Sequence, residues 1–255
     1  MTIEELIMLK NTSSRLCLST FLWLGISTHT FASERQQADY QPALAVVKKQ
    51  LKEINWHSLH DSENWAYTVE TRLDNGNTGP EIQQTKQRFD PSYPLSQQWQ
   101  LLEAGFAKPT KARLEQHKMT MQEISKDNSP TPIGEVDIVD LSTLLPLDSN
   151  ADQAQFSFNP RLMMFDEHIN QLFEGILIFD NKKQHITYLH IKSKESFSPK
   201  LSFTVESYSL NIKIAKDNEE LHVVNIQSEK SGSAFYFKNF DEKSVRSFTQ
   251  FERVN

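Results

Sequence analysis

The sequence predicts an α+β fold: a curved antiparallel β-sheet, or partial barrel, with helices packed on one side. Three observations lead to this prediction. A helical apolar pattern begins at Pro42, and a strand pattern of period two follows it at once. From Phe156 onward, strand-like runs alternate with turns up to the end of the chain. One sheet covered by helices would bury the apolar faces of both halves, so we expect a single domain over residues 33–255.

The N-terminal 32 residues are expected to be a secretory signal peptide. Residues 16–27 form an apolar run that follows Lys10 and Arg15. The run is too short for a membrane span, which needs about 20 residues. Small residues at Thr30 and Ala32 fit the cleavage pattern of exported proteins, and we predict cleavage after Ala32. The product would be periplasmic.

The start of translation is a separate hypothesis. Glu4 and Glu5 offset the basic residues that a signal peptide needs near its beginning. A start at Met8 instead of Met1 would leave a short, net positive segment before the apolar run.

The composition excludes several classes of protein. The 255 residues are 38% hydrophobic and 24% charged, which is enough apolar material for a core. A net charge of −6 argues against a nucleic-acid binder, and only seven glycines argue against phosphate-cradling loops. The single cysteine, Cys17, lies in the apolar run, so the mature chain has no disulfide and no thiolate chemistry. No later stretch is long and apolar enough for a transmembrane segment.

The first half of the mature chain reads as helix, hairpin and further helices. Leu44, Val47, Leu51 and Ile54 share one face of a helix expected over residues 42–59. A strand over 65–73, a turn over 74–77 and a return strand over 82–89 follow. The later expected elements are a strand over 97–102 closed by Gly105, a helix over 109–124, a loop over 126–134 and a short helix over 136–147 that ends near Pro146.

The second half reads as a meander of about six antiparallel strands. They are expected over 172–179, 185–192, 201–214, 221–227, 234–240 and 244–254. Ser231-Gly232-Ser233 is interpreted as a hairpin turn. In the third strand, Phe203 and Val205 have the opposite parity to the apolar residues that begin at Tyr208. A bulge near Glu206-Ser207 would restore a single apolar face and would bend the sheet.

One segment resembles a known family. Arg88-Phe89-Asp90-Pro91 is followed by Gln98-Trp99 to Leu102, then by Gly105 and Pro109-Thr110. This pattern resembles the R-[FY]-D-P…W-x-L-L…G…P-T signature of an uncharacterised family of exported proteobacterial proteins. It covers about 23 residues, from Arg88 to Thr110. The order of elements also resembles the lipoprotein-carrier (LolA-like) superfold of periplasmic lipoprotein chaperones. That resemblance implies a cavity that accepts acyl chains, and it transfers no functional residue.

Catalytic motifs are scarce in this chain. The sequence has no G-x-S-x-G elbow, no phosphate-binding glycine loop and no H-E-x-x-H, and it points to no cofactor. His57, His60 and Asp61 are spaced to share a helix face and to meet a metal, or they form an exposed helix end. His185 and His190 are five apart on a strand, which places them on opposite faces. We therefore predict neither catalytic nor metal-binding residues.

Acidic residues have structural interpretations. Glu219-Glu220 and Asp241-Glu242 are expected at solvated turns between strands. Asp166-Glu167-His168 is expected to be polar surface or the start of a helix. Asp90, before Pro91, is expected to organise a turn.

The candidate ligand-binding residues are apolar. Trp65, Tyr67 and Val69 share one face of the first strand, and Tyr208, Leu210 and Ile212 share one face of a meander strand. We expect these six side chains to line a cavity. The alternative is that Trp65, Tyr67 and Trp99 belong to the core, and the sequence leaves both alternatives open.

Three functions are compatible with these patterns. The first is a non-enzymatic periplasmic protein that binds an apolar ligand, such as a lipid or a lipoprotein acyl chain. The second is an interaction module that has a filled core and docks to another protein of the cell envelope. The third is a hydrolase with a dispersed site, which would need His57, His60 and a carboxylate in one cleft.

Overall fold

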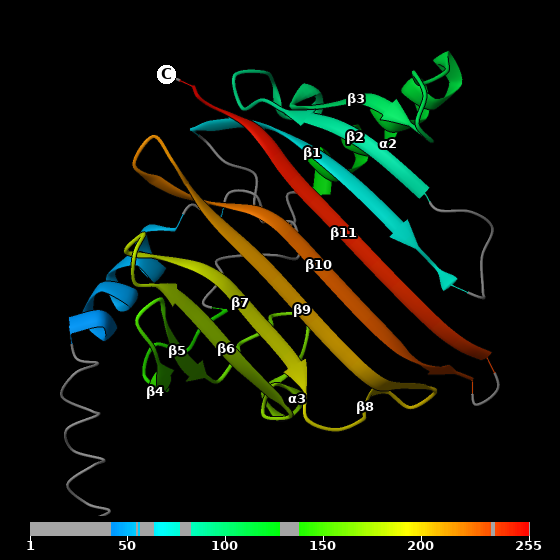
Figure 1. Cartoon of the computed structure of the whole chain (residues 1–255). Helices are drawn as coiled ribbons and strands as arrows, with labels where there is room; N and C mark the ends of the chain where they lie inside the picture. Colours follow the sequence, from blue (N-terminus) through cyan, green and yellow to red (C-terminus); the bar gives the residue numbers. More distant parts are fainter. Residues whose placement is uncertain are drawn as a thin grey trace, which may run out of the picture. The chain divides into compact units, whose positions relative to one another are not determined.

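A computed structural model of the chain describes residues 42–54, 56, 64–76, 83–127, 138–235 and 238–254. Its strands are β1 (Trp65–Asp74), β2 (Gln83–Phe89), β3 (Trp99–Ala104), β4 (Leu145–Ser149), β5 (Gln153–Phe158), β6 (Phe173–Asp180), β7 (His185–Ser193), β8 (Phe197–Lys200), β9 (Phe203–Asp217), β10 (Glu220–Ala234) and β11 (Lys238–Arg253). They form one antiparallel sheet in the order β3-β2-β1-β11-β10-β9-β7-β6-β5-β4, with β8 paired to β9 (Figure 1). The described strands leave this sheet open. The predicted α+β class is confirmed.

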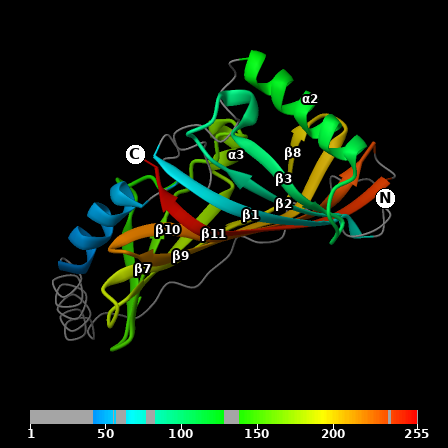
Figure 2. The same cartoon turned by 90° about the horizontal axis from the view of Figure 1, so that it is seen from above.

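Helices accompany the sheet as predicted. A helix over residues 42–53 precedes β1, α2 (Lys111–Asp127) follows β3, and α3 (Glu167–Asn170) precedes β6. Helix α2 lies beside β3 (Figure 2), where a ring nitrogen of His117, Nε2, is 3.1 Å from the carbonyl oxygen of Trp99. None of the helices in the described ranges is long and apolar enough to cross a membrane.

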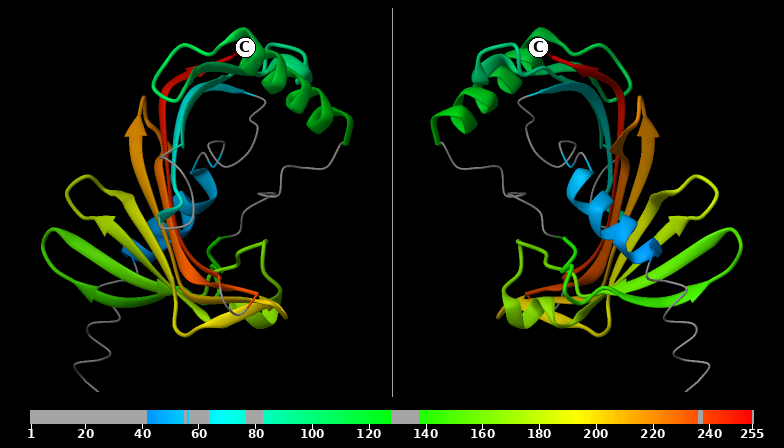
Figure 3. Two further views of the ribbon diagram at one scale, coloured as in Figure 1. Left: turned by 90° about the vertical axis from the view of Figure 1, so that its right-hand side faces the viewer. Right: turned by 90° about the vertical axis from the view of Figure 1, so that its left-hand side faces the viewer.

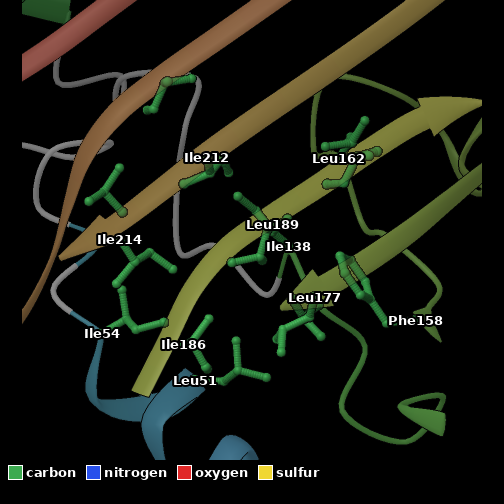
Figure 4. Packing of buried hydrophobic residues seen from close by; sticks show 14 of the residues in the cluster. Leu51, Ile54, Ile138, Phe158, Leu162, Leu177, Ile186, Leu189, Ile212 and Ile214 are labelled. Atoms are coloured by element: carbon green, nitrogen blue, oxygen red, sulfur yellow. The ribbon is translucent and has the colours of Figure 1, made fainter. Parts of the chain in front are cut away.

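The first helix buries the face that its periodicity predicts. Val47, Leu51 and Ile54 are 0%, 6% and 4% exposed. Figure 4 shows Leu51 and Ile54 beside Ile186 and Ile214 of the sheet. The helix ends at residue 53, earlier than predicted, and residues 55 and 57–59 of the predicted span lie outside the described part.

One glutamine fastens this helix to the sheet. Gln50 Nε2 donates to the carbonyl of Gln184 at 2.8 Å, and Gln50 Oε1 accepts from the amide of Ile186 at 2.9 Å. The two polar atoms of one side-chain amide therefore bind the end of the β6–β7 turn and the start of β7. This fixes the helix at one end of the sheet, next to the aliphatic core.

The two faces of the sheet are defined by register. Ile226 of β10 lies opposite Ile212 of β9 and opposite Arg246 of β11, and Arg246 lies opposite Thr71 of β1. Directly opposed residues point to the same side of a sheet. We call the side that carries these four residues the concave face, because the sheet curves around it (Figure 3). The other side is the convex face.

The predicted bulge in β9 is present. Ser231 of β10 pairs with Ser207, whereas the next residue, Gly232, pairs with Val205, so Glu206 is the extra residue. The bulge brings Val205 and Tyr208 to the same face although their spacing is odd, and both are buried. It thereby extends the apolar face along the whole strand.

A short helix over residues 136–147 was expected, and this expectation is wrong. A turn precedes the edge strand β4 instead. The carboxylate of Asp140 accepts from the amide and hydroxyl of Ser142 at 3.0 and 2.6 Å, and the carbonyl of Asp140 accepts from the amide of Thr143. These local bonds compete with a helical conformation. Strand β5, after β4, was not predicted.

The expected turn at Ser231-Gly232-Ser233 is also wrong, because β10 continues to Ala234 and β11 begins at Lys238. The turn lies around Phe235, which has a positive φ of 53°. The separate strand expected over 234–240 instead contains the last residue of β10, the turn at Phe235 and the first residues of β11. Asp241-Glu242 lies within β11 and not at a turn.

The remaining predicted strands match β1, β2, β3, β6, β7, β9, β10 and β11 in place, although β10 and β11 are longer than expected. The helix expected over 109–124 is α2. The expected signal peptide and most of the loop expected over 126–134 lie outside the described residues.

Candidate functional site

The candidate residues on β1 lie at the centre of an aromatic cluster. Tyr67 is 2% exposed. The centre of its ring lies 5.2 Å from Phe89, 6.0 Å from Trp99, 5.9 Å from Phe248 and 6.2 Å from Phe251. These five residues are called the Tyr67 cluster below. They come from β1, β2, β3 and β11, which are brought together only by the pairing of the first strand with the last.

Val69 extends this cluster along the concave face. It lies opposite Phe248 and is 5% exposed. Trp65, the third candidate on β1, is half-buried, and its ring lies 4.9 Å from the ring of His222.

His222 is a buried polar side chain that the sequence did not single out. It is 1% exposed, and its ring stacks on Phe251 at 4.5 Å. Its Nδ1 atom is buried without a hydrogen-bond partner. Burial lowers the pKa of His222, against the opposing effect of the carboxylates of Glu220 and Asp217. The side chain is therefore neutral near pH 7.

The candidate residues on β9 have a different setting. Tyr208 is 8% exposed and lies 5.5 Å from the ring of Phe173 and 6.0 Å from that of Phe165. Phe197 of β8 completes this group, 5.3 Å from Phe173. Burial raises the pKa of Tyr208 to about 12, so its hydroxyl stays protonated. We call these four residues the Tyr208 cluster.

Ile212 and Leu210 differ in their access to solvent. Ile212 is 0% exposed and packs in the aliphatic core with Leu189 and Ile214 (Figure 4). Leu210, two residues away on the same face, is half-buried. Of the six candidates, only Leu210 and Trp65 keep a substantial part of their surface accessible.

A stacked pair of rings spans three strands on the concave face. Phe203 of β9 and Phe240 of β11 lie 4.8 Å apart with an interplanar angle of 9°. Gly232 of β10 is directly opposite Phe240, and a Cβ atom there would lie 2.8 Å from the Phe240 ring. The missing side chain of Gly232 therefore leaves the space that the Phe240 ring uses to reach β9.

Polar side chains occupy the concave face between these aromatic groups. Ser228 and Lys230 of β10 lie opposite Ser244 and Glu242 of β11, and all four are half-exposed. Lys230 Nζ lies 3.0 Å from Glu242 Oε1. Solvent therefore reaches the concave face along β10 and β11.

The two histidines of β7 do not face opposite ways as predicted. Thr187 is an extra residue in the pairing with β6, so Ile186 and Leu189 are both buried in the core despite their odd spacing. His185 and His190 therefore share the other side. The two rings have different hydrogen-bond partners: His185 Nδ1 contacts the carbonyl of Ile186, and His190 Nδ1 lies 2.6 Å from Asn211 Oδ1.

In the described part of the chain, no group of three histidine, cysteine or acidic side chains is placed so that it could hold a metal ion. His57, His60 and Asp61 lie outside this part. Asp166 caps α3, with its carboxylate accepting from the amide of Ile169 at 2.9 Å. Asp166, Glu167 and His168 are also exposed, so this segment is both polar surface and the start of a helix.

In the segment that carries the signature, Asp90 and Arg88 make structural hydrogen bonds. Asp90 organises a turn, as expected, by accepting from the amide and hydroxyl of Ser92. Arg88 lies opposite Thr68, on the convex face, where it donates to the carbonyl of Gln250 at 2.7 Å and pairs with Glu252 at 2.6 Å. Arg88 thus ties β2 to β11 across β1 and is directed away from the concave face.

No family model matches the chain, and no curated protein matches it. Among solved structures, it is similar to a LolA superfamily protein, NE2245 from Nitrosomonas europaea. The similarity covers 84% of this chain and 94% of that one at 12% identity, with a TM-score of 0.32. At these values it assigns neither residues nor function to this chain.

Proposed function

We propose that the protein is exported to a periplasm and there binds an apolar ligand, such as a lipid or a lipoprotein acyl chain, on the concave face of its sheet. The observation that carries this proposal is the access of solvent to an apolar surface. Leu210 is half-buried between buried Tyr208 and Ile212, beside the half-exposed residues of β10. An apolar chain laid there would remove both surfaces from water.

The burial of an apolar chain contributes enough free energy for binding even if the protein has no dedicated polar site. Each buried methylene group contributes about 0.8 kcal/mol, so a chain of ten would contribute about 8 kcal/mol before the cost of association. Half-buried rings of Trp99, Phe203, Phe240 and Phe251 offer further contact area. Export rests on the signal peptide that we predict up to Ala32.

Binding rather than catalysis is proposed because of the groups that the concave face presents. On the described strands, they include apolar side chains, hydroxyls, amides, the Lys230–Glu242 ion pair and the cation of Arg246. A general acid–base pair needs two groups whose environments separate their pKa values, and this ion pair holds opposite charges in one environment.

Native mass spectrometry tests the proposal. The protein is purified from its native envelope fraction and weighed before and after organic extraction. We expect an added mass that extraction removes and that is identified as a lipid. Leu210→Asn should reduce the fraction of protein that carries the added mass. Ile176 is a half-buried residue on the convex face, and Ile176→Asn should leave this fraction unchanged. A bare chain mass together with no uptake of added lipids would contradict the proposal.

A second function, docking to an envelope protein, is favoured by one observation. Leu201 and Phe235 are 97% and 63% exposed at neighbouring turns, where the amide of Phe235 donates to the carbonyl of Ser202 at 2.7 Å. Exposed apolar side chains grouped at turns are typical of interaction surfaces. If the protein carries no lipid, crosslinking from position 235 in the native envelope should identify the partner.

A further inference from the structure

Arg246 occupies an unusual position on the concave face. It is exposed, and it lies in the middle of β11. Its direct neighbours across the sheet are Ile226 of β10 and Thr71 of β1. Along its own strand, the nearest residues on the same face are Ser244 and Phe248. The guanidinium therefore has no acidic neighbour at any of these four positions.

The described residues also contain no ion-pair partner for Arg246. The next acidic residue on this face of β11 is Glu242, and its carboxylate is already paired with Lys230. A guanidinium carries five N–H donors in a planar fork. Those of Arg246 are left to solvent or to a ligand.

Hydroxyl groups surround this cation. Thr71 lies opposite Arg246, Ser244 lies two residues along β11, and Ser228 lies opposite Ser244. All three are half-exposed, and no side-chain hydrogen bond of theirs occurs within the described ranges. Residues diagonally placed across two strands are about 7–8 Å apart, within the reach of an arginine side chain. Arg246 and the three hydroxyl side chains thus place several hydrogen-bond donors side by side on the concave face.

An apolar surface begins immediately beside these donors. Ile226, Val69 and Phe248 are 8%, 5% and 4% exposed and occupy positions next to Arg246 on the same face. Beyond Ile226 lies Ile212, which leads to the half-buried Leu210. A ligand held at Arg246 therefore meets an apolar surface in two directions, toward the Tyr67 cluster and toward β9.

We infer that the ligand of the concave face is an amphiphile with an anionic head group, a carboxylate or a phosphate, that binds Arg246 and the hydroxyls of Thr71, Ser228 and Ser244. This inference rests on the proposed function and specifies its ligand class. A guanidinium binds two oxygens of either head group through parallel N–H bonds, and each hydroxyl donates one more. The chain of the amphiphile lies over the apolar residues beside the cation.

The chain offers a matched control in Arg72. It is an exposed arginine on β1, opposite Val245 and Gln84, and it also has no ion-pair partner among the described residues. It differs in its surroundings, because it lies on the convex face with Glu70 and Asp74 two residues away on the same side. If the anion bound to any exposed arginine, replacing either Arg246 or Arg72 would weaken anion binding. At the proposed site, only the replacement of Arg246 weakens it.

Binding of matched ligands tests the inference. Delipidated protein is titrated with tetradecanoate, tetradecanol and a lysophosphatidate of the same chain length, with displacement of a polarity-sensitive dye as the readout. We expect the wild type to bind at least one of the two anions about tenfold more tightly than the alcohol, as one charge-assisted pair provides. Which anion binds more tightly distinguishes a carboxylate ligand from a phosphate ligand.

Two arginine variants test whether the preference for the anion arises at Arg246. Arg246→Gln should abolish the preference for the anion and leave the affinity for tetradecanol unchanged, while Arg72→Gln should retain the preference. Thermal unfolding of both variants checks that they fold. Equal affinity for anion and alcohol in the wild type, or equal effects of the two variants, would overturn the inference and leave the proposed function standing. Binding of none of the three ligands would contradict the proposed function itself.

Discussion

Replacing Gly232 by alanine should destabilise the sheet strongly, although the substitution adds only a methyl group. A Cβ atom at this position would lie 2.0 Å from the carbonyl oxygen of Thr204 and 2.8 Å from Cζ of Phe240. Both distances are far below van der Waals contact. The backbones of β9 and β10 must move apart at Thr204 and the Phe240 ring must also give way, and a ring movement separates the stacked Phe203–Phe240 pair.

The magnitude follows from these two effects. Overpacking of a well-packed site costs about 1–3 kcal/mol, and a lost aromatic pair costs about 0.5–1.5 kcal/mol. We therefore expect Gly232→Ala to lower the free energy of unfolding by about 2–4 kcal/mol. Urea denaturation followed by tryptophan fluorescence measures this change, and a lower midpoint at an unchanged slope would identify it as a loss of native stability.

Gly105→Ala is the control. Gly105 has a φ of 62°, and nothing lies within 4 Å of a Cβ atom built on it. Alanine there should cost only the strain of a left-handed backbone, about 1 kcal/mol. The reasoning would be refuted if Gly232→Ala cost no more than Gly105→Ala. Adding Phe240→Leu to Gly232→Ala should recover part of the loss, because it removes one of the two close contacts.

Two further predictions concern polar side chains inside the fold, buried His222 and half-buried Asn170. Burial lowers the pKa of His222 below the ordinary 6.5, so the unfolded chain binds more protons and the free energy of unfolding should fall as the pH drops below 6.5. His222→Phe should weaken this pH dependence; unfolding midpoints between about pH 8 and pH 5 measure it, and an identical profile in the variant would contradict it. Asn170→Ala should cost about 2–3 kcal/mol in thermal or urea unfolding, since Asn170 binds both backbone groups of Leu162 and the carbonyl of Phe165. A cost below about 0.5 kcal/mol would show that these bonds do not hold the segment that places Phe165 in the Tyr208 cluster.

The elements that the sequence predicted well are those whose apolar periodicity is local. In β1, the residues from Trp65 to Leu73 alternate without interruption, and the strand matches the prediction within one residue. In β9, the parity change after Val205 was enough to place the bulge. In both strands, the face toward the core can be read from neighbouring residues alone.

The errors come from features that depend on distant partners. Ser231-Gly232-Ser233 has the composition of a turn, but Gly232 is required by the close approach of Thr204 from β9 and of the Phe240 ring from β11. Along the same strands, Lys230 and Glu242 replace apolar residues on the concave face, which removes the periodic signal.

The candidate site was predicted as two separate sets of residues. The residues of β1 and β9 share the concave face because β1 pairs with β11, and no local sequence pattern predicts this pairing. His222 was missed for the same reason, since Trp65 and Phe251 approach it from the two ends of the chain. Phe248 and Phe251 were recognisable as apolar strand residues, but their contact with Tyr67 was not.

The pairing of β1 with β11 also has a consequence for the order of folding. Trp65 lies opposite Arg253, so the seam between these strands joins segments almost at opposite ends of the described chain. The hairpins from β4 to β11 are local in sequence and can form early, whereas β1 to β3 have no neighbour to join until β11 has been synthesised. The edge residues of β1 then remain open to other strands during that interval. A chain interrupted before β11 would keep most of the meander and would lose the attachment of the first three strands.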